Sequence, residues 1–293
     1  MTKKTLTPSA LQTQARLGRR LLRRLRQSLR YQRRSFNGLP VLFANSFPKS
    51  GTHLLTQILQ AFEEVSPAVN CGLPAVVTFQ GDTARQRPVE QILSDLRRFL
   101  PGDIGYGHLH AEPPVVELLT SPAFAAYFVL RDPRDVVVSH VHYVAEMEPR
   151  HALHEYYVNE LHTFEERLSA SISGLEHLSL PLPNIRQRFA PFLGWLQAQA
   201  VLTLRYEDLM QDRQAQLQSI LEHAVRRGLP IKCSIAEAVE KIETCINPQR
   251  SPTFRKGKIG GWRESFTAEH IRLFKEISGD ILIRLGYEKD MDW

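Results

Sequence analysis

The chain has 293 residues, 43% of them hydrophobic, which is enough to bury the core of one large or two small domains. It contains no run of eighteen apolar residues and no apolar core in its basic N-terminus, so we expect neither a membrane-spanning helix nor a secretory signal. Its three cysteines are scattered, match no metal-ligand spacing and predict a reducing, cytoplasmic environment: Cys71, Cys233 and Cys245.

The net charge of +6 is carried by the N-terminal segment. Residues 1–40 contain eleven Lys and Arg and no Asp or Glu, which leaves 26 basic against 31 acidic side chains in the rest of the chain. A basic pocket inside an acidic body suits a small phosphorylated ligand. Binding of nucleic acid would instead spread positive charge over the domain surface, so we expect no nucleic-acid partner.

Residues 1–38 form a predicted basic arm ahead of a domain that spans 39–293. Leucines recur every four residues in the arm with arginines between them, a pattern that predicts a basic amphipathic helix: Leu17, Leu21, Leu25 and Leu29. Two placements are open. The helix lies on an anionic membrane or an acidic partner, or its leucines pack on the domain and its arginines are solvated. We expect a chain without residues 1–36 to fold and to bind its ligand, because the motifs all lie beyond the arm. Leucines packed on the domain predict instead that this truncation lowers the melting temperature.

The first candidate site lies between a strand and a helix in the segment 41–56. Val41–Ala44 is an apolar run of strand length, and the apolar residues after His53 have helical spacing. The turn between them contains Lys49, Ser50, Gly51 and Thr52. Amides of a first helical turn favour an anion, to which the lysine adds charge and the hydroxyls add donors. Pro48 and Phe43 stand where the Walker pattern needs Gly. The turn is therefore another kind of phosphate site or a capped junction with a solvated lysine.

A short glycine-containing strand is predicted over Ile104–His110 and ends in two histidines. His108 and His110 face the same way if the strand continues through both. Either could serve as a general base or simply pack. No third ligand is near in the sequence, so we expect no metal there.

The segment 128–140 repeats the pattern of strand, turn and helix. Arg131 in its turn offers a planar fork for a phosphate next to a helix N-terminus, with Ser139 on the helix. Alternatively, the Arg-Asp-Pro-Arg-Asp turn is an ion-paired helix cap. Several histidines follow without the i, i+4 spacing of a helical zinc pair, and we expect them to be partly exposed: His140, His142, His151, His154 and His162.

A last strand is predicted over Val201–Asp208, and a glycine-rich basic loop follows over Arg255–Arg263. Strands that alternate with helices predict an α/β fold with a mostly parallel sheet covered by helices on both faces. Ligands of such sheets bind at the carboxyl ends of the strands. The side chains expected to meet there are those that follow predicted strands: Lys49, His108, Arg131 and Tyr206.

Taken together, the three turns resemble those of the cytosolic-type sulfotransferase family, which uses 3′-phosphoadenosine 5′-phosphosulfate (PAPS) and has a P-loop-like fold. Its members carry a Pro-Lys-Ser-Gly-Thr turn, an Arg-Asp-Pro-Arg-Asp turn with a following Ser, and a late Arg-Lys-Gly-x-x-Gly-x-Trp loop. The resemblance implies these cofactor-binding residues: Lys49, Ser50, Gly51, Thr52, His53, Arg131, Ser139, Tyr206, Arg255, Lys256 and Gly257. Arg131, Ser139 and the late loop would hold the 3′-phosphate, and Tyr206 would contact adenine.

The resemblance also implies an in-line transfer of the sulfuryl group from PAPS to a hydroxyl or amine, with the 3′,5′-bisphosphate (PAP) as product. Lys49 would neutralise charge on the departing oxygen, and His108, in a Thr-His-Leu-type context, would be the base. His110 occupies a place where Pro is common. No metal is implied, and the acceptor is a small molecule, a carbohydrate or a lipid.

The chain departs from the family at three places. Leu54 replaces a Trp that often stacks on adenine, Phe254 lies one residue nearer the late loop than usual, and the dimer motif is replaced by Arg263, Thr267-Ala268 and Arg272. Two other classes stay open. One is a kinase or other nucleoside-phosphate transferase, which the missing Walker glycines disfavour. The other is a non-catalytic PAP-binding protein.

Overall fold

A computed structural model describes residues 8–80, 85–247, 249 and 257–293. In this part of the chain the centre is a six-stranded sheet of order β2-β4-β1-β5-β6, with β3 paired to β4, and the strand pairs are parallel. The strands are β1 (Val41–Ser46), β2 (Val69–Asn70), β3 (Val76–Val77), β4 (Asp103–His108), β5 (Phe124–Leu130) and β6 (Val201–Arg205).

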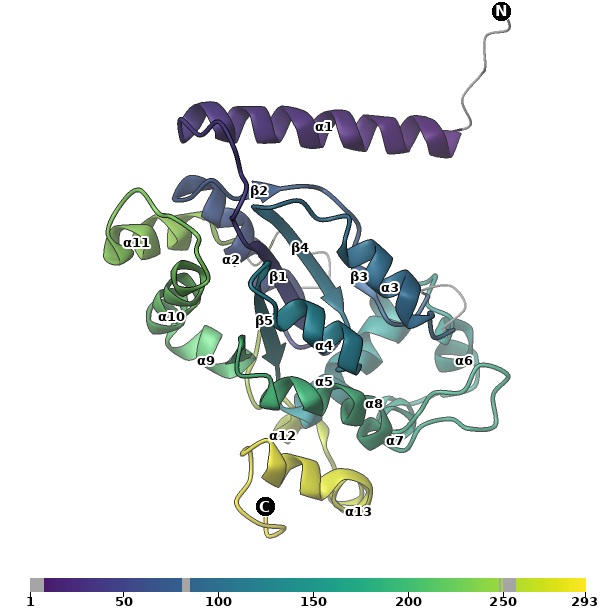
Figure 1. Cartoon of the computed structure of the whole chain (residues 1–293). Coiled ribbons are helices and arrows are strands. Elements are labelled where there is room, and N and C mark those ends of the chain that lie inside the picture. Colours follow the sequence, from purple (N-terminus) through teal and green to yellow (C-terminus); the bar gives the residue numbers. More distant parts are fainter. Residues whose placement is uncertain (1–7, 81–84, 248, 250–256) are drawn as a thin grey trace, which may run out of the picture.

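Helices connect the strands and extend the chain at both ends (Figure 1). Those before β5 are α1 (Pro8–Arg30), α2 (Thr52–Ala61), the 3₁₀ turn η1 (Phe62–Glu64), α3 (Val89–Leu96) and α4 (Pro113–Thr120). Between β5 and β6 lie α5 (Pro133–His142), the π-helical turn η2 (Tyr143–Met147), α6 (His154–Asn159), α7 (Phe164–Ser173), α8 (Ile185–Phe189) and the 3₁₀ helix η3 (Ala190–Gln197). After β6 come α9 (Tyr206–Gln211), α10 (Arg213–Arg226), α11 (Ile235–Cys245), α12 (Trp262–Ser265) and α13 (Ala268–Arg284).

The core lies on both faces of the sheet, because successive side chains of a strand point to opposite sides. Leu42 and Ala44 of β1 belong to a buried cluster with α2, α10 and α11. Val41 and Phe43 belong to a second cluster with α3, α4, α5, α7 and α13. The prediction of a mostly parallel sheet flanked by helices on both faces is confirmed.

Two strand ends differ from the sequence prediction. β6 ends at Arg205, and Tyr206 begins α9, where Glu207 and Asp208 in the first turn suit the helix dipole. β4 ends at His108, because the Asn45 amide side chain takes over both backbone groups of the next residue, Leu109. His108 and His110 therefore do not share one face of a strand.

Helix α1 contacts the domain through its arginines. One of the two placements expected from the sequence had the leucines on the domain instead. The helix lies along the end of the sheet where β4 begins (Figure 1). Arg20 and Arg24 both form ion pairs with Asp103, whose side chain is fully buried, and Arg20 itself is only 8% exposed. The leucine face is exposed, so the alternative in which the leucines pack on the domain is wrong. In the described residues no helix is both long and apolar enough to cross a bilayer.

We expect Arg20→Ala to lower the free energy of unfolding by about 1.5–3 kcal/mol, the range for a hydrogen bond to a charged group. Burial already raises the pKa of the Asp103 carboxyl, and the substitution removes one of the two guanidinium groups that oppose this effect. Urea unfolding measures the change. Arg26→Ala, at an exposed position of the same helix, should stay within about 0.5 kcal/mol of the unmodified chain.

Equal losses for the two variants would contradict a stabilising contact between α1 and the domain. Because this contact covers a buried carboxylate, we also expect removal of residues 1–36 to lower stability. This replaces the expectation, drawn from the sequence, that the arm is dispensable for folding.

Candidate active site

The turn after β1 is built to approach a ligand with its backbone. Lys49 has a φ of 69° and Gly51 a φ of 97°, both in the left-handed region that glycine adopts most easily. A Cβ on Gly51 would lie 2.5 Å from Cδ2 of Tyr206, so no larger residue fits there. Ser50 is fully buried, and its hydroxyl has no hydrogen-bond partner. A buried hydroxyl without a partner, beside the first amides of α2, is the kind of donor that an anion would satisfy.

Lys49 is held over an aromatic ring. Its Nζ lies 3.9 Å from the ring centroid of Tyr143, the first residue of the π-helical turn η2. Burial, and secondly the charge of Arg131, lowers the pKa of Lys49 to about 8. Lys49 and Arg131 are therefore close enough to repel, and an anion between the two turns would relieve that repulsion.

His108 at the end of β4 is tied to the first turn. Its Nδ1 lies 3.1 Å from the carbonyl oxygen of Ser46 and 3.0 Å from the Ser46 hydroxyl, which is also 2.7 Å from Oγ1 of Thr52. A carbonyl can only accept, so Nδ1 carries the hydrogen and Nε2 keeps its lone pair. Burial lowers the pKa of His108, against the opposing effect of the Ser46 carbonyl. The imidazole is thus neutral near pH 7, with Nε2 available as a base.

His110 is placed as a packing residue. Its ring contacts Phe79 and Phe192 edge to face, with centroid distances of 5.2 and 4.8 Å. Burial lowers the pKa of His110 to about 4. Trp195 donates to the carbonyl of Leu109 between the two histidines at 2.7 Å, which fixes the backbone there.

The second turn brings Arg131 to Tyr206. The Arg131 guanidinium lies 4.6 Å from the Tyr206 ring centroid, and its Nη2 donates to the carbonyl of Lys258 at 2.8 Å. Its Nε is buried without a partner. Since Gly51 packs on the same Tyr206 ring, this ring joins the first and second turns. Ser139 is half-buried, two turns into α5.

The alternative of an ion-paired helix cap also describes part of this turn. Asp132 accepts from the backbone of Arg134 at 2.9 Å and pairs with its guanidinium at 2.7 Å. That guanidinium lies between two rings, 4.0 Å from Trp262 and 4.5 Å from Trp293. Arg134 is therefore structural, and Arg131 is the arginine that keeps an unpartnered donor.

Asp135 connects the second turn to the late loop. Its carboxylate accepts from the amides of Gly260 at 2.8 Å and Trp262 at 2.9 Å. Gly257 lies just before this segment with a φ of 61°. Arg255 and Lys256, predicted to hold the ligand, lie outside the described residues, as does Phe254.

One histidine of α5 is less exposed than expected, whereas His142, His151 and His154 are partly exposed as predicted and His162 is exposed. His140 is 9% exposed, accepts or donates a hydrogen bond with the Ser171 hydroxyl at 3.0 Å, and contacts the ring of His151. Its predicted partial exposure is wrong, because α7 covers that side of α5. No group of three side chains able to hold a metal ion is found among the described residues.

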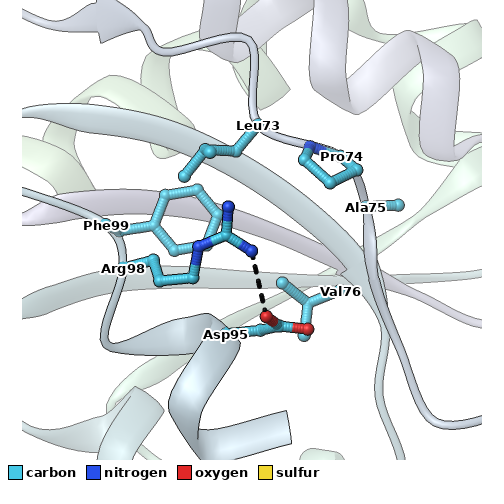
Figure 2. A pocket seen from close by; sticks show the side chains of 7 residues that line it. All are labelled: Leu73, Pro74, Ala75, Val76, Asp95, Arg98 and Phe99. Carbon is cyan, nitrogen blue, oxygen red and sulfur yellow. Dashed lines mark hydrogen bonds and ion pairs between the residues drawn. The ribbon is translucent and has the colours of Figure 1, made fainter. Parts of the chain in front are cut away.

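A small hollow lies elsewhere, between β3 and the end of α3 (Figure 2). Its lining residues are Leu73, Pro74, Ala75, Val76, Asp95, Arg98 and Phe99. Arg98 forms an ion pair at 3.1 Å with Asp95 on the same α3 side of the hollow, and the Arg98 carbonyl accepts from Arg20 of α1. The hollow thus belongs to the α1 end of the molecule and contains no residue predicted for the site.

The sulfotransferase domain family matches residues 40–286. The chain belongs to that family. It is a PAPS-dependent sulfotransferase, as the three turns predict, which sets aside the alternatives of a kinase and of a non-catalytic PAP-binding protein.

Solved structures of other sulfotransferases have the same fold. The mouse sulfotransferase SULT7A1, complexed with PAP, matches with a TM-score of 0.54 and 19% identity over 83% of this chain and 84% of its own. Retinol dehydratase, in complex with androsterone and inactive cofactor PAP, matches with a TM-score of 0.56 and 17% identity over 82% of this chain and 80% of that one. At these identities the likeness shows the fold.

Three side chains that contact residues of the candidate site are not indicated by the sequence analysis. Tyr143 contacts Lys49, Asp135 holds the late loop, and Glu207 accepts from the backbone of Asp132 at 2.9 Å. Asp135 lies in the Arg-Asp-Pro-Arg-Asp turn, and Glu207 directly follows Tyr206. The available signal for both contacts is an acidic side chain within a motif of the candidate site, where it can accept from backbone amides. No local pattern marks Tyr143, because its contact depends on how α5 and the first turn meet.

Proposed function

We propose that the sulfotransferase binds the phosphates of PAPS between its first and second turns. Lys49, Ser50, Gly51, Thr52 and His53 hold the 5′ side. Arg131, Ser139 and the late loop with Arg255, Lys256 and Gly257 hold the 3′-phosphate, and Tyr206 lies against adenine. Two buried donors without partners, the hydroxyl of Ser50 and Nε of Arg131, support this placement, since bound phosphate oxygens would satisfy both.

Sulfuryl transfer breaks the bond between sulfur and the bridging oxygen of the bisphosphate and forms one to the acceptor oxygen or nitrogen. Negative charge collects on the departing oxygen, where the Lys49 ammonium stabilises it. The acceptor gives its proton to Nε2 of His108, whose other ring nitrogen is held by Ser46. The single observation that carries this proposal is that hydrogen bond, because it fixes a neutral tautomer beside the Lys49 turn.

The acceptor proposed is a small molecule, a carbohydrate or a lipid that carries a hydroxyl or amine. Phe79 lies two residues beyond the partner of His108 in the sheet, is 43% exposed and contacts the His110 ring. This aromatic surface near the proposed base favours an acceptor with an apolar part. We place the reaction in the cytoplasm, with peripheral contact to an anionic membrane through the arm.

Arg131→Ala is expected to weaken PAP binding by about 1.5–3 kcal/mol, or roughly 10- to 150-fold, through loss of charged hydrogen bonds to phosphate. Isothermal calorimetry measures the affinity. Arg272→Ala is the matched control, because Arg272 is exposed on α13 and pairs only weakly with Glu269 and Glu276. Failure of the folded, unmodified protein to bind PAP, or preferential binding of ATP with magnesium, would refute the proposal.

A further inference from the structure

The outer face of α1 is a continuous row of exposed leucines. Their exposed fractions are 50% for Leu17, 66% for Leu21, 67% for Leu22, 58% for Leu25 and 71% for Leu29. The opposite face is already engaged with the domain, since Arg20 and Arg24 pair with Asp103 and Gln27 donates to the carbonyl of Glu63. The helix therefore cannot turn its leucines inward without breaking these contacts. An exposed apolar row of this kind marks an interaction surface.

The arginines beside this leucine row indicate which kind of partner binds it. Residues 17–34 contain eight arginines and no acidic side chain. Arg26 and Arg34 are exposed beyond the domain contact. A second copy of α1, packed leucine against leucine, would bring arginines toward arginines with no carboxylate of either helix to pair with them. Anionic lipid headgroups supply both an apolar layer for the leucines and phosphates for the arginines.

We propose that α1 docks the protein on an anionic bilayer through this leucine face and holds the catalytic end of the domain away from that bilayer. Asp103, which anchors α1, is the first residue of β4, and His108 is the last. Five residue steps at ~3.3 Å each separate them by about 17 Å. Figure 1 shows α1 across the end of the sheet from which the arrowheads of β4 and β5 point away.

The orientation rests on the proposed function, because it takes His108 and the first turn as the catalytic end. It narrows the substrate class: the acceptor reaches the site from the aqueous side and is not a headgroup of the bilayer that α1 occupies. The three tryptophans report on this orientation independently of any substrate. Trp195 bonds to Leu109 just beyond β4, Trp262 to Asp135, and Trp293 stacks on Arg134, all at the catalytic end.

Co-sedimentation tests the docking. The full chain should pellet with vesicles of phosphatidylcholine and phosphatidylserine but not of phosphatidylcholine alone, and salt should weaken binding because the Debye length is only about 10 Å at 0.1 M. Leu21→Ser/Leu25→Ser should reduce the bound fraction at least tenfold at unchanged circular dichroism. Leu196→Ser/Val225→Ser, at exposed apolar positions elsewhere, should bind as the unmodified chain does. Equal sedimentation of the two double variants, no sedimentation at all, or a dimer that the leucine variant dissociates would overturn the proposal.

Quenching by brominated lipids tests the orientation. Tryptophan fluorescence of the vesicle-bound protein should change little, whereas Leu25→Trp should add a strongly quenched signal. Strong quenching of the native tryptophans would overturn the orientation while leaving docking intact. Absence of PAP binding in solution would instead count against the proposed function and would not alter either vesicle result.

Discussion

Lys49→Ala is expected to lower turnover at least a hundredfold and up to about a thousandfold, the cost of removing one preorganised group that stabilises developing charge. The turn places this ammonium where the departing bisphosphate is proposed to bind, and burial over the Tyr143 ring leaves little water to replace it. Turnover is measured with labelled PAPS and whichever acceptor a broad sulfation screen identifies. Lys241→Ala, on the exposed side of α11, is the control and should retain full turnover.

The pH dependence separates charge from packing at this position. Because burial lowers the pKa of Lys49 to about 8, its protonated form is lost as pH rises through that value. We therefore expect kcat/KM to fall above pH ~8 and this fall to disappear in Lys49→Arg, whose guanidinium stays charged. If kcat/KM of Lys49→Arg fell by the same factor at the same pH, a group other than Lys49 would be the one that titrates.

What the sequence predicts well here is local. Each phosphate-type turn is a contiguous run in which an apolar strand, polar turn residues and a helix start follow one another, so Lys49 and Arg131 could be placed at strand ends without a structure. The common edge of the parallel sheet then brings them together. The bond between Ser46 and His108 joins residues 62 positions apart, and only the pairing of β1 with β4 creates it.

The N-terminal arm shows a second limit of prediction from sequence. Helical periodicity distinguishes an arginine side from a leucine side but does not say which one faces the domain. The deciding partner is Asp103, a single acidic residue far along the chain, which is fully buried under Arg20 and Arg24. Likewise, the burial of His140 depends on α7, which no pattern around residue 140 indicates.

His108→Ala is expected to lower turnover by about a hundredfold to ten-thousandfold, the range for a positioned acid–base group, while PAP affinity changes less than about twofold. The imidazole is proposed to act on the acceptor and not on the bisphosphate, so its loss removes the proton acceptor without removing a phosphate contact. Calorimetry and turnover on the same preparation separate the two effects. His110→Phe is the matched variant, because phenylalanine can keep the ring contacts with Phe79 and Phe192.

The pH profile gives the same assignment a second test. Burial lowers the pKa of His108 below its ordinary value of about 6.5, so the neutral, basic form persists into mildly acidic solution. We expect kcat/KM to rise with pH through a limb below about 6.5 and this limb to be absent in His108→Ala. His110→Phe should retain both the limb and the turnover. Should His110→Phe be inactive and His108→Ala active, the base is His110, and the hydrogen bond from Nδ1 of His108 to Ser46 is only structural.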